Sequence, residues 1–513
     1  MLGLMQDQPL LISLLIEVAE RHNGDGEIVS RRVEGDIHRT TWGGIASRVR
    51  QVANALDGEQ LLFSDRIATL AWNGYRHLEL YYGVSGSGRV LHTINPRLHP
   101  DDQIAWIANH AEDQILCFDL SFLPLVQAVH ARCPTIRKWI ALCDADKLPA
   151  DSGIPNLVSY ESWMGKPTDY DWPTFDENLA SSMCYTSGTT GNPKAALYSH
   201  RSTLLHAYAA ALPDVMRLSA RDSVLPVVPM FHVNAWGIPY SAALVGCKIV
   251  FPGPALDGKS VFELIESEGV TFAAGVPTVW QMMLGHMQAN GLKFSKLNRT
   301  VIGGSACPPA MITAFQEKFN VEVLHAWGMT EMSPLGTLCT LKNKHLSLPP
   351  DAQLQIRMKQ GRAIFGVDMK IVDGDGKELP WDGKAYGDLL VKGPDRQGIL
   401  QGRGRRSTDP RRTGPRLVPH GRCRHHRRRG LPADHRPQQG RDQVRRRMDQ
   451  LDRDREHRRR APGRRHGRLH RRVPSEVGRA PDHRGREEAR CGSHARRAAE
   501  VLRRQDRQVA DPG

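Results

Sequence analysis

The sequence predicts a layered α/β protein, and three observations support this class. Short runs rich in β-branched and aromatic residues alternate with helical stretches, which is the pattern of strands covered by helices. The chain has 513 residues, too many for one hydrophobic core, so we expect two or more domains. Its 40% hydrophobic and 24% charged residues are ordinary for globular proteins and exclude collagen-like, coiled-coil and polytopic membrane classes.

The clearest elements lie between residues 248 and 331. We expect buried strands at Lys248–Phe251 and Val270–Ala274, with an amphipathic helix over Ser260–Glu268 between them. A third strand, Thr300–Ile302, ends in two glycines before a helix that begins at paired prolines. A fourth strand, Val321–Leu324, runs into a polar loop. Because ligands of open α/β sheets bind at the carboxyl ends of strands, we expect a ligand site at these loops.

Further along, Gly366–Val391 shows alternating apolar residues and Asp-Gly turns, which predict a small β-rich subdomain. At the other end of the chain, the start lacks a basic region and reads as an amphipathic helix rather than a signal peptide. The sequence has no apolar run of 18 residues, so we expect no transmembrane segment. The nine cysteines form no CxxC pair, which favours a reduced, cytoplasmic protein.

The net charge of +15 is distributed unevenly. From Asp395 to Gly513 the chain holds 36 Arg, no Lys, 15 acidic residues and no Phe, Trp or Tyr, which gives a formal charge of +21. The first 394 residues therefore carry −6. The chain is a mildly acidic globular body joined to a basic segment of different composition.

The strongest chemical signal is the segment Tyr185–Ala195, which reads Y-T-S-G-T-T-G-N-P-K-A. Its glycines let the backbone approach an anion, its hydroxyls add hydrogen-bond donors, and its lysine adds a positive charge. Such a loop suits the phosphates of a nucleotide triphosphate. The alternatives are a P-loop, whose spacing is absent, and a polar surface loop, which fits only parts of the string. The candidate phosphate-binding residues are Thr186, Ser187, Gly188, Thr189, Thr190, Gly191 and Lys194.

Four further segments follow along the chain: Pro229–Trp236, Gly275–Trp280, Gly303–Ala306 and His325–Glu331. With the glycine-rich segment, they resemble the adenylate-forming enzymes, which include acyl-CoA synthetases, luciferases and peptide-synthetase adenylation domains. The resemblance covers roughly residues 10 to 394. Within this family, the runs at residues 69–82 and 91–98 are similar to those of medium- and long-chain fatty acyl-CoA synthetases.

The resemblance implies roles for individual residues. Thr186 and Glu331 would hold Mg²⁺ and, with His232, act in catalysis, although His232 taken alone reads as an ordinary packed histidine. Trp327, where the wider family more often has tyrosine, would stack on adenine through its π-face. The implied nucleotide-binding residues are Gly304, Ser305, Ala306, Ala326, Trp327, Gly328, Met329 and Thr330, beside the phosphate loop. The implied acyl-pocket residues are His232, Val233, Asn234, Trp236, Gly275, Val276 and Pro277, with Trp236 matching an aromatic that gates the fatty-acid tunnel.

The function implied is an ATP-dependent fatty acid–CoA ligase that forms an acyl-adenylate and then an acyl-CoA. Its partners would be a fatty acid, ATP, coenzyme A and Mg²⁺, with no specific nucleic acid, and homodimer formation is left open. The alternatives are a ligase for a short sulfur-containing or aryl acid, and a non-functional remnant with a basic tail. We expect an N-terminal AMP-binding domain at residues 1–365, a small β-rich subdomain at 366–394 and a separate tail at 395–513.

Three interpretations of the tail remain. It is a disordered Arg-rich segment, a nucleic-acid-binding arm, or a GC-rich reading frame translated out of register. The third can be tested with codons: Asp442–Gln450, read one base forward, permits I-K-S-G-G-E-W-I, and the tryptophan is forced by Met448 and Asp449. Other stretches permit D-W-F-P-T-G-D-V-A-T and I-T-D-R-S-K-D-V, which resemble the linker and hinge of the same family. We therefore expect a frameshift near residue 395.

The frameshift has a chemical consequence. The family's ribose-binding aspartate lies in the T-G-D string, its hinge lies in D-R-S-K-D, and its catalytic lysine lies in the C-terminal domain that follows. None of these exists in the chain as translated. That lysine stabilises charge that develops during adenylation, so we expect the chain to be impaired.

Overall fold

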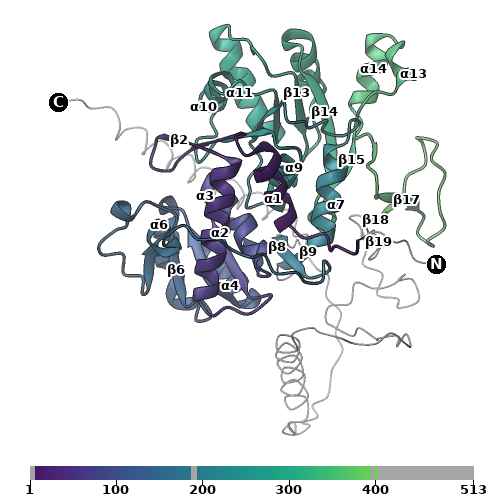
Figure 1. Ribbon diagram of the computed structural model, residues 1–513. Coiled ribbons are helices and arrows are strands. Elements are labelled where there is room, and N and C mark those ends of the chain that lie inside the picture. Colours follow the sequence, from purple (N-terminus) through teal and green to yellow (C-terminus); the bar gives the residue numbers. More distant parts are fainter. Residues whose placement is uncertain (1–5, 187–192, 394–398, 402–513) are drawn as a thin grey trace, which may run out of the picture. The chain divides into compact units, whose positions relative to one another are not determined.

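The computed structural model describes residues 6–186, 193–393 and 399–401 (Figure 1). All of them belong to one compact unit, Met1–Gly421, whereas the second unit, Arg422–Gly513, lies outside the described residues. Apart from residues 399–401, the predicted tail of 395–513 also lies outside them. The predicted α/β class is confirmed, because two large, mainly parallel sheets alternate with helices.

The larger sheet has nine strands in the order β16-β15-β14-β13-β12-β10-β11-β1-β2. Its six central strands are parallel, and antiparallel strands flank them on both sides. The strands are β1 (Glu27–Arg31), β2 (Ile37–Thr41), β10 (Ser223–Pro226), β11 (Lys248–Phe251), β12 (Phe272–Gly275), β13 (Arg299–Ile302), β14 (Glu322–Gly328), β15 (Leu335–Leu338) and β16 (Arg362–Ala363).

The second sheet has seven strands in the order β7-β6-β5-β3-β4-β8-β9. All neighbours are parallel except β8 and β9, which form an antiparallel pair at one edge. The strands are β3 (Arg66–Leu70), β4 (Val90–Thr93), β5 (Asp113–Phe118), β6 (Lys138–Ala141), β7 (Leu157–Ser159), β8 (Ala180–Thr186) and β9 (Lys194–Ser199).

A layer of helices lies between the two sheets and others cover their outer faces (Figure 1). The central layer contains α1 (Ser13–Asn23), α2 (Trp42–Gly58), α3 (Tyr75–Gly86), α7 (His200–Ala211) and α9 (Ile238–Val245). The outer face of the nine-stranded sheet carries α10 (Gly258–Ser267), α11 (Pro277–Asn290) and α12 (Pro309–Thr313), and that of the other sheet carries α4 (Ala105–Ala111) and α5 (Leu123–Val129). The remaining helical segments are α6 (Tyr160–Met164), α8 (Val233–Trp236), α13 (Asn343–Leu346) and α14 (Pro350–Arg357).

Successive side chains of a strand point to opposite faces of the sheet, so one strand contributes to the hydrophobic cores on both faces. Ile28 and Val301 face the central helical layer, whereas Val29 and Ile302, each one residue further along, face the outer helices. All four are fully buried. Strands buried on both faces read as continuous apolar runs, which is why these segments stand out in the sequence.

The predicted elements between residues 248 and 331 are confirmed within a few residues, as β11, α10, β12, β13 and β14. The predicted helix after the paired prolines begins as α12 and continues as a wider turn over Ala314–Lys318. The predicted β-rich segment contains β17 (Asp368–Val372) and β18 (Asp388–Lys392), which form a third sheet with β19 (Ile399–Gln401). The proposed domain boundary at residue 366 stays a prediction.

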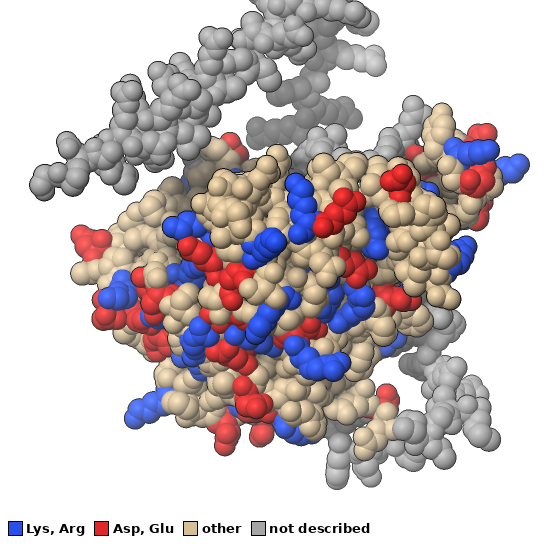
Figure 2. Space-filling model, turned by 90° about the horizontal axis from the view of Figure 1, so that it is seen from above, with Lys and Arg blue, Asp and Glu red and all other residues tan. Residues whose placement is uncertain are grey.

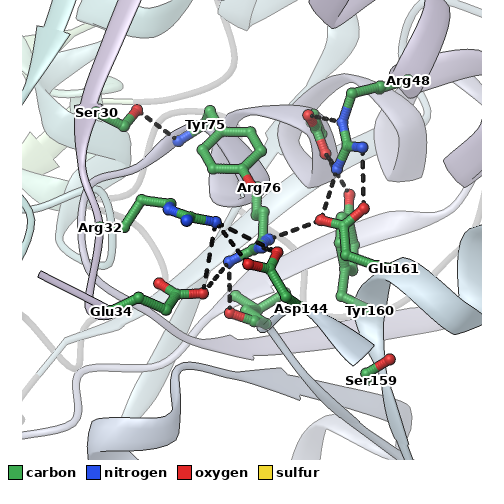
Figure 3. A network of polar contacts seen from close by, with 12 residues as sticks. Ser30, Arg32, Glu34, Arg48, Tyr75, Arg76, Asp144, Ser159, Tyr160 and Glu161 are labelled. Carbon is green, nitrogen blue, oxygen red and sulfur yellow. Dashed lines mark hydrogen bonds and ion pairs between the residues drawn. The ribbon is translucent and has the colours of Figure 1, made fainter. Parts of the chain in front are cut away.

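A buried ionic network joins the turn after β1 to α2, α3 and α6 (Figure 3). Arg76, only 5% exposed, pairs with Glu34 at 2.8 Å, with Glu161 at 2.9 Å and with Asp144. Arg48 of α2 also pairs with Glu161, at 3.0 Å. Removing one partner would leave a buried charge uncompensated, so the network fixes how these elements meet. On the surface drawn in Figure 2, by contrast, positive and negative side chains are interspersed.

Candidate active site

The predicted phosphate loop joins β8 to β9. Thr186 ends β8 and is directly paired with Lys194, which begins β9. The Thr186 hydroxyl donates to the Lys194 carbonyl oxygen at 3.3 Å, and the Lys194 side chain is exposed. Residues 187–192, which include Ser187, Gly188, Thr189, Thr190 and Gly191, lie outside the described residues. The element that follows this segment is β9, a strand paired with β8, and not a helix.

The carboxyl ends of β12, β13 and β14 meet at one edge of the nine-stranded sheet, as predicted. These strands are parallel neighbours, with Ile302 beside Gly275 and His325. Gly304 has a φ of +80°, a left-handed conformation that suits glycine, and a Cβ placed there would lie 3.2 Å from a methyl group of Val276. The loop Gly303–Ala306 thus lies against the segment that follows β12. Apart from the buried Gly303, these loop residues are exposed.

His325 holds this loop in place, which the sequence did not reveal. The amide N–H of Cys307 donates to Nε2 of His325 at 3.2 Å, and the other ring nitrogen lies 3.0 Å from the Met358 carbonyl oxygen. Burial lowers the pKa of His325, so the neutral ring can accept at Nε2 and donate at Nδ1.

Trp327 is half-buried, and one face of its ring packs against a neighbouring strand. A Cβ placed on Gly336 of β15 would lie 2.6 Å from the Trp327 ring, so the indole packs directly on that glycine. A planar ring supported on one face is suited to stacking on the other. Ala326 is buried and lies against Gly303, with its carbonyl oxygen 3.2 Å from a Cβ placed there. Gly328 and Glu331 are exposed, and Met329 and Thr330 are half-buried.

The predicted acyl segment contains a left-handed turn. Val233, Asn234, Ala235 and Trp236 have φ between +49° and +58°, and Gly237 follows at +74°. Left-handed backbone costs about 1–2 kcal/mol for each residue other than glycine, so the turn requires strong local support. Residues other than glycine that are held in the left-handed region cluster at active sites and ligand-binding segments.

Trp236, at the end of the turn, brings the acyl segment to the predicted adenine loop. Its indole lies 3.3 Å from a Cβ placed on Gly303 and 3.8 Å from one placed on Gly304. His232, just before the turn, is exposed, although the surrounding atoms still lower its pKa by desolvation. The acyl and nucleotide segments predicted from sequence are therefore in contact.

Other predicted acyl-pocket residues have structural roles. Asn234 is buried and donates from Nδ2 to the Ser182 hydroxyl of β8 at 2.9 Å. Gly275 lies against the Trp280 ring, and Pro277 is buried at the first turn of α11. Asparagine tolerates left-handed backbone better than most residues, and its amide anchors the turn.

A second asparagine, missed at the sequence level, fixes the segment leading to His232. Asn73 is buried after β3 and donates to the carbonyl oxygens of Pro226 and Val228 at 2.8 Å. Its side-chain oxygen accepts the amide N–H of Met230 at 2.6 Å. These bonds join the two large sheets beside the candidate site. Their sequence separation exceeds 150 residues, so no local signal predicts them.

Comparisons with known proteins agree with this geometry. Residues 15–402 match the family model described as AMP-binding enzyme. The chain is 52% identical over 394 residues to 3-methylmercaptopropionyl-CoA ligase of Ruegeria lacuscaerulensis, covering 77% of this chain and 73% of the relative. It is 51% identical, over 77% of the chain and 72% of the relative, to medium-chain-fatty-acid–CoA ligase of Ectopseudomonas oleovorans.

Among solved structures, the anthranilate CoA ligase AuaEII in complex with anthranoyl-AMP superimposes with a TM-score of 0.67. It is 21% identical, and the match covers 77% of this chain and 73% of that one, which supports the fold. Within the described residues, none of the helices is both long and apolar enough to cross a bilayer. The fold, the converging segments and the extensive identity lead to one conclusion: the chain belongs to the AMP-binding enzyme family, among its adenylate-forming acyl-CoA ligases.

Proposed function

We propose that the chain carries the adenylation site of a fatty acyl-CoA ligase. The observation that carries this proposal is the convergence at one place of Trp236, the Gly303–Ala306 loop and the end of β14. A carboxylate would attack the α-phosphate of ATP to give acyl-adenylate and pyrophosphate, and the coenzyme A thiol would then displace AMP. ATP and coenzyme A are substrates of the acyl-CoA ligases to which the chain belongs.

The phosphates of ATP would bind at the loop between Thr186 and Lys194. Lys194 supports this role because its exposed side chain lies directly opposite Thr186 across the hairpin. Trp327 would stack on adenine with the ring face opposite Gly336, while Gly304, Ser305 and Ala306 would line the base. The acyl chain would lie along His232, Val276 and Trp236.

Glu331 and Thr186 would hold Mg²⁺. Mg²⁺ in nucleotide sites uses one or two carboxylates together with substrate phosphates, and the exposed carboxylate of Glu331 fits that donor set. The described residues contain no cluster of three His, Cys, Asp or Glu that would form a separate cage. Bound there, the ion would neutralise negative charge on the phosphates.

A second candidate substrate is a short sulfur-containing acid. This candidate is supported by the 52% identity to a 3-methylmercaptopropionyl-CoA ligase, which is as high as the 51% identity to the medium-chain-fatty-acid–CoA ligase. An aryl acid is the remaining alternative. We also propose a cytoplasmic location, supported by the scattered cysteines, of which the seven in the described part of the chain are free and buried.

The proposal is tested by pyrophosphate release from ATP with octanoate, 3-methylmercaptopropionate and benzoate, using a version in which the frame near residue 395 is restored. Octanoate is expected to give the highest kcat/KM. A preference for 3-methylmercaptopropionate would replace the fatty-acid assignment with the sulfur-containing one. Lys194→Ala is expected to weaken ATP-dependent release at least tenfold without unfolding the protein, because the side chain is exposed. Full release by that variant would refute its phosphate role.

A further inference from the structure

Tyr198 joins the two sheets beside the candidate site. It lies on β9, four residues after Lys194, and is only 4% exposed. Its side chain packs in a small cluster with Cys184 of β8 and Val233 of the left-handed turn. Its hydroxyl donates to the carbonyl oxygen of Thr330 at 2.5 Å. β9 belongs to the seven-stranded sheet, whereas Thr330 follows β14 of the nine-stranded sheet.

The bond acts on the peptide unit that leads into Glu331. A peptide is planar, so the Thr330 carbonyl oxygen and the amide nitrogen and Cα of Glu331 lie in one plane. Holding that oxygen fixes the direction in which the chain enters Glu331. Hydrogen bonds from the Met329 amide to the Pro334 carbonyl and from the Met332 amide to the Met329 carbonyl, both 3.0 Å, hold the rest of this turn.

The surroundings of the hydroxyl make the bond strong and specific. Desolvation by burial is the main reason that the pKa of Tyr198 lies well above its usual value, and the nearby Cys184 and Glu331 add to it. The hydroxyl is therefore protonated and available as a donor. A buried donor that loses its acceptor costs more than an exposed one, so the Thr330 carbonyl is held firmly.

We propose that Tyr198 is a positioning residue that orients Glu331 for the binding of Mg²⁺–ATP. Tyr198 does not touch the reacting atoms and acts through the Thr330–Glu331 peptide. The inference rests on the proposed function, because it assigns a support to the residue that would hold Mg²⁺. A tyrosine that merely fills space would serve equally well without its hydroxyl.

The test is Tyr198→Phe in the full chain, with binding of ATP measured by calorimetry in the presence and absence of Mg²⁺. Phenylalanine keeps the ring and removes the donor. Loss of this hydrogen bond is expected to weaken Mg²⁺–ATP binding about three- to tenfold. Binding of AMP without Mg²⁺ is expected to be unchanged, because adenine contacts do not depend on Glu331.

Tyr82→Phe is the matched control. Tyr82 of α3 is also buried and donates to the Pro239 carbonyl oxygen at 2.9 Å, so this change removes a bond of the same kind elsewhere. It is expected to leave both affinities unchanged. In a Glu331→Gln background, Tyr198→Phe is expected to have no further effect on Mg²⁺–ATP binding.

Equal Mg²⁺–ATP affinity in Tyr198→Phe and the unaltered protein would overturn the inference, as would equal losses in both tyrosine variants or an equal loss for AMP. Failure of the unaltered protein to bind either nucleotide would overturn the proposed function and the inference with it. The two failures are therefore distinguishable.

Discussion

The body formed by the two large sheets and the small third sheet differ sharply in how they bury their side chains. In the body, large residues such as Trp42, Trp280 and Tyr82 are inaccessible to solvent. In the segment 366–393 only Val372 and Val391 are buried, whereas Trp381 and Tyr386 are 67% and 93% exposed. A sheet needs a second layer to bury its apolar face, and the described residues supply very little of one.

The space between the small sheet and α7 illustrates the same difference. A cavity of about 830 Å³ is lined there by Tyr208, Leu212, Phe365 and Val367, among others. Tyr208, Leu212 and Phe365 are all exposed, Phe365 at 80%. The body buries its large apolar side chains, whereas the described part of the small sheet leaves Trp381 and Tyr386 exposed. The frameshift near residue 395 stays a prediction, and in a frame-restored protein the added chain is expected to cover this apolar surface.

The largest expected effect concerns the reading frame. The chain as it stands is expected to form acyl-CoA at least a hundredfold more slowly than a version shifted by one base near residue 395. The reason is that the proposed frameshift would remove the charge-stabilising lysine, and loss of one such group costs about 10²–10³ in rate. The measurement is acyl-CoA formation by both proteins under the same conditions. Comparable rates, or a protease-resistant fold in residues 395–513, would contradict the frameshift.

Within the body, Trp280→Ala is expected to lower the free energy of unfolding by about 3–5 kcal/mol. Trp280 is fully buried among the helices outside the nine-stranded sheet, and its removal leaves a cavity. Urea unfolding followed by circular dichroism measures the change. A loss below about 1 kcal/mol would show that this core relaxes around the gap.

A smaller effect is expected from pH, and again only in the body. Burial lowers the pKa of His206 to about 4, whereas an unfolded histidine titrates near 6.5. The unfolded chain therefore binds more protons between these values, and the free energy of unfolding is expected to fall as pH decreases from about 6.5 to 4, by up to ~1.4 kcal/mol per pH unit. His77, whose pKa burial lowers to about 4, adds to the same loss.

The check is urea unfolding at pH 7.5 and 5.0 for the unaltered protein and for His206→Gln, which keeps an acceptor for the Leu335 amide N–H. The variant is expected to show a shallower pH dependence. Parallel behaviour of the two proteins would mean that His206 is not the group that titrates. The segment 366–393 contains no histidine and is expected to contribute nothing.

The smallest effect is expected for Trp381→Ala in the chain as it stands. This side chain is mostly exposed, and such changes usually alter stability by less than about 0.5 kcal/mol. In the frame-restored protein the same substitution is expected to cost more, because the added chain would cover this face. Urea unfolding measures both effects. Identical effects in the two proteins would contradict the expectation that the added chain covers the small sheet.

The sequence predicted well those features that depend on local pattern. Lys248–Phe251 is a strand at the predicted bounds because its apolar run is buried on both faces. The convergence of Gly303–Ala306 with the end of β14 followed from the rule that parallel strands deliver their loops to one edge. The residues forming the candidate site could therefore be named before their geometry was known.

Features that depend on distant contacts could not be predicted. Val233 and Ala235 give no local sign of left-handed backbone, and only Asn234 and Gly237 are residues that favour it. Tyr198 reads as an ordinary strand residue until Thr330, 132 residues away, lies beside its hydroxyl. His325 and Asn73 likewise acquire their roles from partners elsewhere in the chain.

The left-handed turn also bears on how enzymes with this segment can evolve. A substitution at Val233, Ala235 or Trp236 must suit both the neighbouring side chains and a backbone that most residues avoid, so few single changes there preserve the fold. Val276, which like Trp236 lies close to Gly304, has ordinary extended backbone and carries no such restriction. New substrate preferences are therefore expected to arise first at positions like Val276, with the turn itself changing last.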